Sequence, residues 1–350
     1  MQVGLLFETA TDLLSQPGAV AQTHYHWREN EEVAALTQAL TTLGHQVESI
    51  GSVTQLLERY QAGLRPDLVW NLSVRAQSRS RTAIAPALLE QLQIPYTGGD
   101  AASKSLVLNK DWLKPLLHWC GILTPEWQRF GLGVVPMALP PWPQSVLKPT
   151  CEGYSLGLSR FDNTAGLTVF QQQVDHLHQQ FHVPVLCEAF IPGREITIGL
   201  VGGDAQCQVL GGVETLTAEA QPLQDQMLDL PRKRQGGDQK VRVDLSQAPF
   251  QDAKAAAIAL FKLLHPLDYA TFDFRVTATG SAYLLDVNAD ATLHPQRSLA
   301  KIAAAEGLSY GQLIAAILET VQQRWPATGR TSMGHSPCPE LDPPAAQRSL

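Results

Sequence analysis

Two carboxylates and an amide stand within two apolar segments near the end of the chain, 271–275 and 284–288. Asp286 and Asn288 are two residues apart, so both project from the same face of a strand. If the two segments pair as a hairpin, Asp273 comes to lie close to Asp286. Carboxylate and amide oxygens are the ligands that Mg²⁺ prefers. Because charges among apolar neighbours are costly to bury without partners, we expect a metal site here; the alternative is a solvated sheet face.

A second candidate is Lys148, which ends the apolar run 145–147 and precedes Pro-Thr-Cys-Glu-Gly-Tyr-Ser-Leu-Gly. The glycines and the serine of this stretch predict a flexible turn whose backbone N–H groups can approach a phosphate closely. It is not the common phosphate loop in which the lysine follows the glycines. Taken alone it also fits an ordinary turn. Cys151 lies in the turn, but no histidine stands near it in the sequence to activate a nucleophile.

Further polar residues carry weaker signals. Glu188 and Glu195 bracket Ala-Phe-Ile-Pro-Gly-Arg, and Glu195 fits either a nucleotide contact or a surface strand. His176, His178 and His182 lie in a helical segment, but their spacing does not place all three on one face, which favours a solvated helix over a metal site.

Composition excludes several classes of protein. The chain has 350 residues and a formal net charge of −7, which gives no basic field for nucleic acid or an anionic membrane. No run approaches the roughly 18 apolar residues of a membrane span. The five cysteines are scattered, without metal-ligand spacing, which is typical of reduced thiols in a cytoplasmic protein. The start of the chain reads as a strand rather than a signal peptide.

The elements that must position these residues fall into three units. Residues 1–103 alternate apolar strands and helices, which predicts a doubly wound parallel sheet of the α/β class. Residues 104–185 predict a smaller α+β unit that contains the glycine turn, and residues 186–326 a third unit with the carboxylates. The polar stretch 214–240 predicts a mobile loop that closes over a substrate. Residues 327–350 are expected to be a disordered tail.

Several stretches together resemble the ATP-grasp enzymes of the D-alanine–D-alanine ligase type. They lie in the same order as in that family and span about residues 68–322. The matching segments are Ile-Pro-Tyr-Thr-Gly-Gly-Asp (94–100), Asn-Lys (109–110) with Gly-Ile-Leu-Thr-Pro (121–125), Val-Leu-Lys-Pro (146–149) with Glu-Gly-Tyr-Ser (152–155), 188–195, and Asp273 with Asp-Val-Asn (286–288).

The resemblance implies an ATP-grasp architecture and a role for each matching residue. Lys110 and Lys148 would contact the ATP phosphates, Glu188 and the backbone near Ile191 the adenine, and Glu195 the ribose. The loop over the phosphates would consist of Glu152, Gly153, Tyr154 and Ser155. Two Mg²⁺ or Mn²⁺ ions would be held by Asp273, Asp286 and Asn288. A phosphorylated intermediate would form, and an amine would displace the phosphate to make a C–N bond.

The pattern departs from the family on the amino-acid side. Thr271 stands where the family has an arginine, and Arg275 could point the same way and substitute, so we expect Arg275 and Ser155 to be catalytic. Asp286 replaces the usual glutamate. The family's acidic segment is replaced by the arginine- and serine-rich stretch 71–81, and the stretch after the metal-binding asparagine also differs. Candidate contacts to a carboxylate of the substrate are Arg75, Arg79, Arg81, His294 and Arg297; the alternative is a set of solvated loops.

Three functions remain open at this point. The first is a C–N ligase with another substrate pair, such as an amino acid and mycosporine-glycine in mycosporine-like amino acid biosynthesis. The second is a D-alanine–D-alanine ligase for peptidoglycan precursors. The third is a regulatory protein that binds a nucleotide without chemistry. We expect small-molecule partners, no nucleic acid, no membrane, and a homodimer as the assembly to test.

Overall fold

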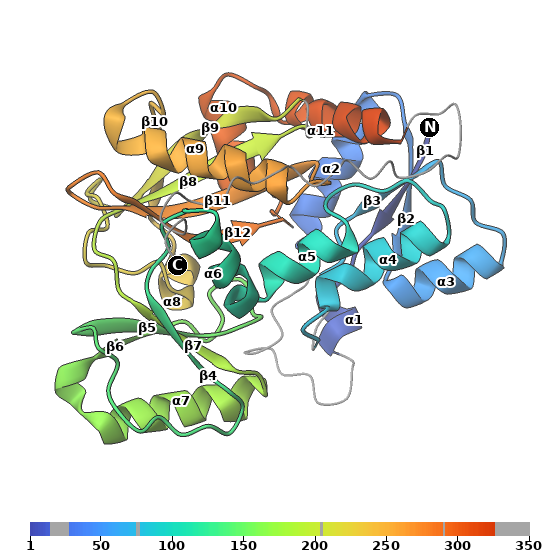
Figure 1. Ribbon diagram of the computed structural model, residues 1–350. Helices are drawn as coiled ribbons and strands as arrows, with labels where there is room; N and C mark the ends of the chain where they lie inside the picture. The colour runs from blue at the N-terminus through green and yellow to red at the C-terminus, as the bar shows by residue number, and fades with distance from the viewer. Residues whose placement is uncertain (15–27, 75–77, 204–205, 290, 326–350) are drawn as a thin grey trace, which may run out of the picture.

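The computed structural model describes residues 1–14, 28–74, 78–203, 206–289 and 291–325. These residues form three β-sheets with helices around them (Figure 1). No helix among them has the length and apolar character needed to cross a membrane.

The first sheet has the order β2-β1-β3, with strands Gln46–Gly51, Gln2–Leu6 and Leu68–Asn71. β1 pairs in parallel with both neighbours, which confirms the predicted parallel sheet. β1 and β3 are apolar and largely buried, whereas the edge strand β2 is mostly polar and only partly buried. The helices of this part of the chain are α1 (Ala10–Leu14), α2 (Asn30–Thr42), α3 (Val53–Gln61), the 3₁₀ turn η1 (Arg81–Ala83) and α4 (Ile84–Gln91).

The second sheet is antiparallel and has the order β4-β7-β5-β6. Its strands are Trp127–Phe130, Val185–Ala189, Gln144–Pro149 and Ser159–Asp162, and α7 (Leu167–Phe181) packs against it. β7 is an inner strand of this sheet, so the boundary predicted at residue 185 falls one strand too early. The third unit begins only at Arg194, where the next strand starts.

The third sheet has the order β10-β9-β8-β11-β12, and each neighbouring pair is antiparallel. Its strands are Gln239–Val243, Gln208–Leu216, Arg194–Val201, Tyr269–Val276 and Ala282–Asn288. Helices α9 (Ala248–Leu263), α5 (Ala101–Leu108) and α6 (Lys110–Trp119) contribute to the apolar core on one face. α5 and α6 therefore pack on the third unit, although the sequence groups them with the second.

The last two helices join the third unit to the first. α10 (Ser298–Ala305) lies over β8, β9 and β10, and α11 (Tyr310–Arg324) contacts α2. One core contains Leu5 and Trp70 of the first sheet together with Leu313 and Ile317 of α11. Figure 1 shows α11 next to α2 and α10 beside β9 of the third sheet. The first and third units consequently share buried apolar surface, which fixes their positions relative to each other.

The stretch predicted as a mobile loop, 214–240, is a loop in its middle, since residues 217–229 contain only turns and isolated β-bridges, with regular elements on either side. β9 continues to Leu216, a short helix α8 spans Leu230–Gln235, and β10 begins at Gln239. We call residues 217–238 the lid. Hydrogen bonds to the lid backbone tie this loop to the rest of the protein, and its mobility stays a prediction. The predicted tail, 327–350, lies outside the described residues.

Candidate active site

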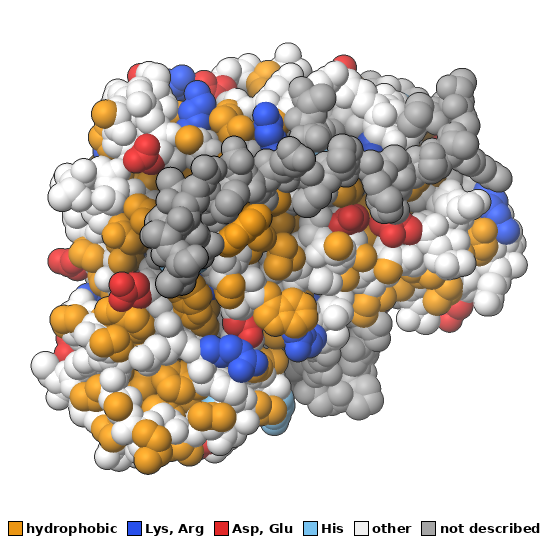
Figure 2. Space-filling model, in the orientation of Figure 1, with side chains coloured by type: hydrophobic (Ala, Val, Ile, Leu, Met, Phe, Trp, Pro, Cys, Tyr) orange, Lys and Arg blue, Asp and Glu red, His pale blue; other side chains and the backbone are white. Residues whose placement is uncertain are grey.

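A cavity of about 840 Å³ lies between the second and third sheets and reaches the first unit. The four-stranded sheet occupies the lower lobe in Figure 1, and Lys and Arg side chains gather where this lobe meets the rest of the molecule (Figure 2). Residues from all three units line the cavity, for example Arg81, Lys148 and Asp286. The architecture therefore brings together residues that are more than 200 positions apart.

Asp273 and Asp286 are direct partners across β11 and β12, as the sequence predicts. A bulge at Leu285 makes this possible, because Phe274 pairs with Leu284 while Asp273 pairs with Asp286. Without the extra residue, Leu284 and Asp286 would share a face. The bulge instead turns the apolar residue into the core and the carboxylate into the cavity.

The contacts of Asp273, Asp286 and Asn288 are those expected of a binding site for a cation. Asp273 accepts hydrogen bonds from Thr197 Oγ1 at 2.7 Å and from Asn288 Nδ2 at 2.9 Å. Burial raises the pKa of Asp273, and the Asp286 and Glu195 carboxylates raise it further. Asp286 Oδ1 is buried without a hydrogen bond, and Lys110 Nζ lies 3.3 Å away. Two close carboxylates and an amide, all oxygen donors, are the set that a hard divalent ion would neutralise.

Lysines of α6 and β5 contact acidic residues of the site, namely Asp286 and Glu188. Lys110 Nζ also donates to the Glu152 carbonyl at 3.0 Å. Lys148 Nζ and Lys114 Nζ lie 2.7 and 2.8 Å from the two oxygens of Glu188. Burial lowers the pKa of Lys114 to about 8, against the opposing effect of Glu188. We did not anticipate Lys114 from the sequence, although it stands one helical turn after Lys110 and so shares its face.

The two predicted nucleotide-binding glutamates are both partnered. Glu188 is buried between Lys114 and Lys148, and these cations lower its pKa against the effect of burial; its contact with the adenine stays a prediction. Glu195 Oε2 lies 3.0 Å from Arg275 Nη2. Both glutamates and Ile191 line the cavity.

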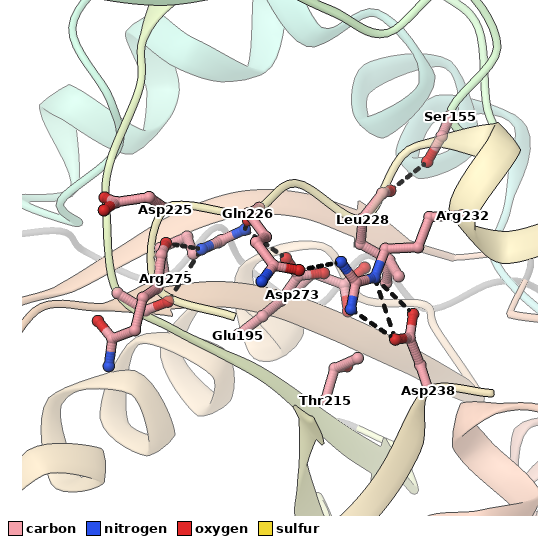
Figure 3. A network of polar contacts seen from close by, with 12 residues as sticks. Ser155, Glu195, Thr215, Asp225, Gln226, Leu228, Arg232, Asp238, Asp273 and Arg275 are labelled. Atoms are coloured by element: carbon pink, nitrogen blue, oxygen red, sulfur yellow. Dashed lines mark hydrogen bonds and ion pairs between the residues drawn. The ribbon is translucent and has the colours of Figure 1, made fainter. Parts of the chain in front are cut away.

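The glycine turn after Lys148 lies over the cavity. Gly153 itself has no positive φ; the left-handed residues are Tyr154, Ser155 and Gly157, with φ of 56°, 59° and 70°. Left-handed backbone is uncommon for residues with a Cβ. Ser155 Oγ donates to the Leu228 carbonyl at 3.2 Å (Figure 3). It also accepts from Lys233 Nζ at 2.7 Å. The turn is thus tied to the lid, and Lys233 is a lid residue that the sequence analysis missed.

Arg275 is buried and holds the lid from below. Its guanidinium donates to the carbonyls of Gly193, Gln224 and Gln226 at 2.9, 2.8 and 2.6 Å (Figure 3). Together with the ion pair to Glu195, these contacts occupy most of its N–H groups. Arg275 lines the cavity together with Thr271, as expected of residues on the same strand face, and its guanidinium is bound to the lid backbone; that it takes the place of the family's arginine stays a prediction.

The arginines predicted to bind a substrate carboxylate are not brought together. Arg75 lies outside the described residues. Arg79 is exposed, stacks on the Trp112 ring at 4.1 Å and does not line the cavity. Arg81 is buried and lines the cavity, where it contacts the Cys151 carbonyl and lies 3.4 Å from Glu152 Oε2. The contact with Trp112 therefore holds the Arg79 side chain away from the cavity.

The two later candidates lie at the end of the cavity near α2. His294 Nε2 is 3.3 Å from both Glu29 and Glu31, and His294 is not a lining residue. Arg297 lines the cavity and lies 3.3 Å from Glu29. Glu29 and Glu32 also line this end. We missed these acids because only the fold brings the start of α2 to the loop before α10.

The remaining candidates do not form sites. Cys151 is buried, and burial raises the pKa of its thiol, which disfavours a nucleophile. Of the three histidines near α7, His176 and His182 are exposed, as a solvated helix predicts, whereas His178 is buried. Among the described residues, no group of three or more His, Cys, Asp or Glu side chains is arranged to hold a metal. The candidate metal site therefore depends on Asn288 as its third ligand.

Comparison with known proteins agrees with this geometry. Residues 141–319 match the family model described as D-ala D-ala ligase C-terminus. A D-alanine–D-alanine ligase from Aquifex aeolicus is 28% identical over 287 residues, which cover 81% of this chain and 92% of the relative. An uncharacterised protein, y4sG, from Sinorhizobium fredii is 26% identical over 314 residues, 87% of this chain and 91% of the relative.

Solved structures show the same fold. The D-alanine–D-alanine ligase from Bacillus anthracis complexed with ATP has a TM-score of 0.67 at 18% identity, covering 92% of this chain and 98% of that structure. A D-Ala:D-Ser ligase from Enterococcus faecalis has a TM-score of 0.65 at 15% identity, covering 91% and 99%.

The fold and the cavity together define an ATP-grasp enzyme, an ADP-forming ligase. The chain belongs to the D-alanine–D-alanine ligase family, as its resemblance to that family predicts.

Proposed function

We propose that this ligase uses ATP and Mg²⁺ to join two small substrates through a C–N bond, with D-alanine as both donor and acceptor. The observation that supports this most directly is the pairing of Asp273 with Asp286 opposite Lys110, at the wall of one cavity. The D-alanine–D-alanine ligases among the relatives favour this substrate pair over other amino acids.

In this proposal the carboxylates and Asn288 hold divalent cations, which supply charge neutralisation for the transferred phosphoryl group. Lys110 and Lys148 lie on the facing wall and neutralise the phosphates. Glu195, already oriented by Arg275, accepts from the ribose hydroxyls. The structure of the Bacillus anthracis relative contains ATP, which supports the same ligand here.

The lid and the glycine turn close the cavity from two sides. Ser155 joins them through Leu228 and Lys233, and Arg275 holds the lid backbone from the sheet. A phosphorylated carboxylate reacts with water, so a closed site lets the amine compete. We therefore assign Arg275 and Ser155 to water exclusion and positioning.

A second candidate is the joining of an amino acid to mycosporine-glycine. The observation that favours it is Thr271, which faces the cavity where the family has an arginine, while Arg275 is bound to the lid. A site with this change is suited to an acceptor other than D-alanine. The expected homodimer and cytoplasmic location remain predictions.

The test is ADP release from purified protein with ATP and Mg²⁺, measured with single substrates and pairs. D-alanine alone stimulating ADP release, with D-alanyl-D-alanine as product, is the expected result. Stimulation only by an amino acid together with mycosporine-glycine would favour the second candidate. ATP binding without turnover on any pair would contradict both and favour a regulatory protein.

A further inference from the structure

Lys240 is a cation of the cavity that neither the sequence motifs nor the proposed mechanism uses. It lies on β10, directly after the lid, and its side chain lines the cavity. β10 is the edge strand of the third sheet, far from Lys110 and Lys148, which belong to α6 and the second sheet. Lys240 thus approaches the cavity from the opposite wall.

The strand register places Lys240 in a row of polar residues. Lys240 pairs with Thr215, Thr215 with Glu195, and Glu195 with Arg275. Residues paired directly across strands point to the same face of the sheet. The row runs beside Asp273, which is two residues before Arg275 on β11 and shares its face. Figure 3 shows Glu195, Thr215 and Asp273 close together beneath the lid.

The contacts of Lys240 leave its charge uncompensated. Its Nζ donates to Thr215 Oγ1 at 2.6 Å, and in the described part of the chain no carboxylate oxygen lies within 4.0 Å of it. Lys110 and Lys148 each have a carboxylate within that distance. Burial lowers the pKa of Lys240, while Asp273 and Glu195, farther away, act in the opposite direction.

The ammonium is partly buried and has a hydroxyl as its one described partner, an arrangement that is costly to desolvate unless an anion completes it. An ammonium has three N–H donors, of which Thr215 takes one. The anion must fit between Glu195, the expected ribose contact, and Asp273, the expected metal ligand. The part of ATP that spans from its ribose to its metal ion is the phosphate chain.

We propose that Lys240 binds the phosphates of the nucleotide, as a third cation opposite Lys110 and Lys148. Thr215 fixes the ammonium in place, so the lysine is preorganised before the nucleotide arrives. Because Lys240 directly follows the lid, its contact also links lid closure to the presence of the phosphates. This inference rests on the proposed ATP site and adds a residue that the matching family segments do not include.

The test compares binding of Mg-ATP and of adenosine by calorimetry in three proteins. Lys240→Met keeps the length and apolar stem of the side chain and removes the charge. It should bind ATP about tenfold more weakly, the loss of one charge-assisted hydrogen bond, and adenosine equally well. Lys262→Met, which alters an exposed lysine in the last turn of α9, should match the unmodified protein for both ligands.

Unchanged ATP affinity in Lys240→Met would overturn the inference, and so would an equal loss for adenosine, since that would reveal a change in cavity shape. Thr215→Val supplies a second measurement. It should weaken ATP binding by a smaller factor, because the ammonium remains but is no longer fixed. Normal ATP and adenosine binding without turnover on any substrate would contradict the proposed ligase activity while leaving the role of Lys240 intact.

Discussion

The cavity has one end that we expect to hold the nucleotide and another end near α2. The polar residues of the two ends come from different kinds of secondary structure. At the nucleotide end the polar groups project from strands, as Asp273, Glu195 and Lys148 do, and strand register fixes their spacing. At the end near α2 they come from loops and helix starts, such as Glu29 and Arg297. Strand-borne residues can be placed from sequence alternation, whereas loop-borne residues depend on contacts that only the complete fold supplies.

The two ends also differ in how closely their segments resemble the family. The segments that resemble the family include those expected to hold the nucleotide. Departures lie in loops, such as 71–81 and the stretch after Asn288, and at Thr271 and Asp286 of strands β11 and β12. A loop can change its residues without shifting a strand register, so substrate preference can change while the phosphate and metal contacts remain. The following predictions are ordered from the largest expected effect.

Asp286→Ala should reduce stimulated ADP release on the order of a thousandfold, since it removes a carboxylate facing the transferred phosphoryl group. The fold should change little, because the side chain faces the cavity rather than the core. ADP release and thermal unfolding measure the two effects. Asp252→Ala, at an exposed position of α9, is the control. Full activity of Asp286→Ala at ordinary Mg²⁺ would remove the metal assignment.

Arg275→Met should release the lid and reduce ligation by about a hundredfold, the effect of a small misplacement at a reacting centre. ADP formation should fall less, because water then reaches the intermediate. The readout is the ratio of ADP to ligated product. Arg160→Met provides a comparison, since Arg160 contacts the lid at Asp225 from the second sheet. If the ratio stays at its unmodified value, Arg275 acts on the chemistry rather than through the lid.

Asp268 lies outside the cavity, where it contacts residues of the first unit and of α11. It accepts from Gly98 N at 2.6 Å and lies 3.0 Å from Arg324 of α11, and burial raises its pKa to about 6. Since the folded pKa exceeds the unfolded one, its stabilisation is complete below about pH 4 and is lost as the pH rises through 6. The change amounts to about 3 kcal/mol.

Asp268→Asn should therefore abolish this component of the pH dependence, which urea unfolding between pH 4 and 7 would measure. An unchanged slope in the variant would show that other groups account for it.

Arg79→Ala should have the smallest effect. Arg79 is exposed and its described side-chain contact is with Trp112, a contact of about 0.5–1 kcal/mol at the surface. KM for ATP and for the acceptor should each change by less than about twofold. Arg81→Ala, the buried neighbour bound to the glycine turn, should raise both. A selective rise in acceptor KM for Arg79→Ala would restore the carboxylate clamp predicted from the sequence.

These contrasts explain how far sequence reasoning reached. Apolar alternation in 271–276 and 282–288 predicted the hairpin and the facing carboxylates, because one buried face imposes a period of two. The bulge was not predicted, although the consecutive Leu284 and Leu285 interrupt that period just before Asp286. The hairpin could be predicted because it involves only two neighbouring strands and the turn between them.

The remaining features depend on contacts between distant segments. The lid has few apolar residues and is ordered by Arg275 and Ser155, which lie outside it. Strand β7 looked like the start of the third unit because it adjoins β8 in sequence, yet its hydrogen bonds are with β4 and β5. No local pattern distinguishes these outcomes.

The most direct test of the metal and nucleotide site is the Mg²⁺ dependence of ATP binding in the unmodified protein and in Asp286→Asn. The variant keeps the size of the side chain and removes one charge. We expect Mg²⁺ to tighten ATP binding to the unmodified protein by about tenfold or more, the scale of coupling between two ligands at adjoining sites. In Asp286→Asn this gain should be largely lost. Equal tightening by Mg²⁺ in both proteins would contradict the assignment of these carboxylates to a metal that holds the nucleotide.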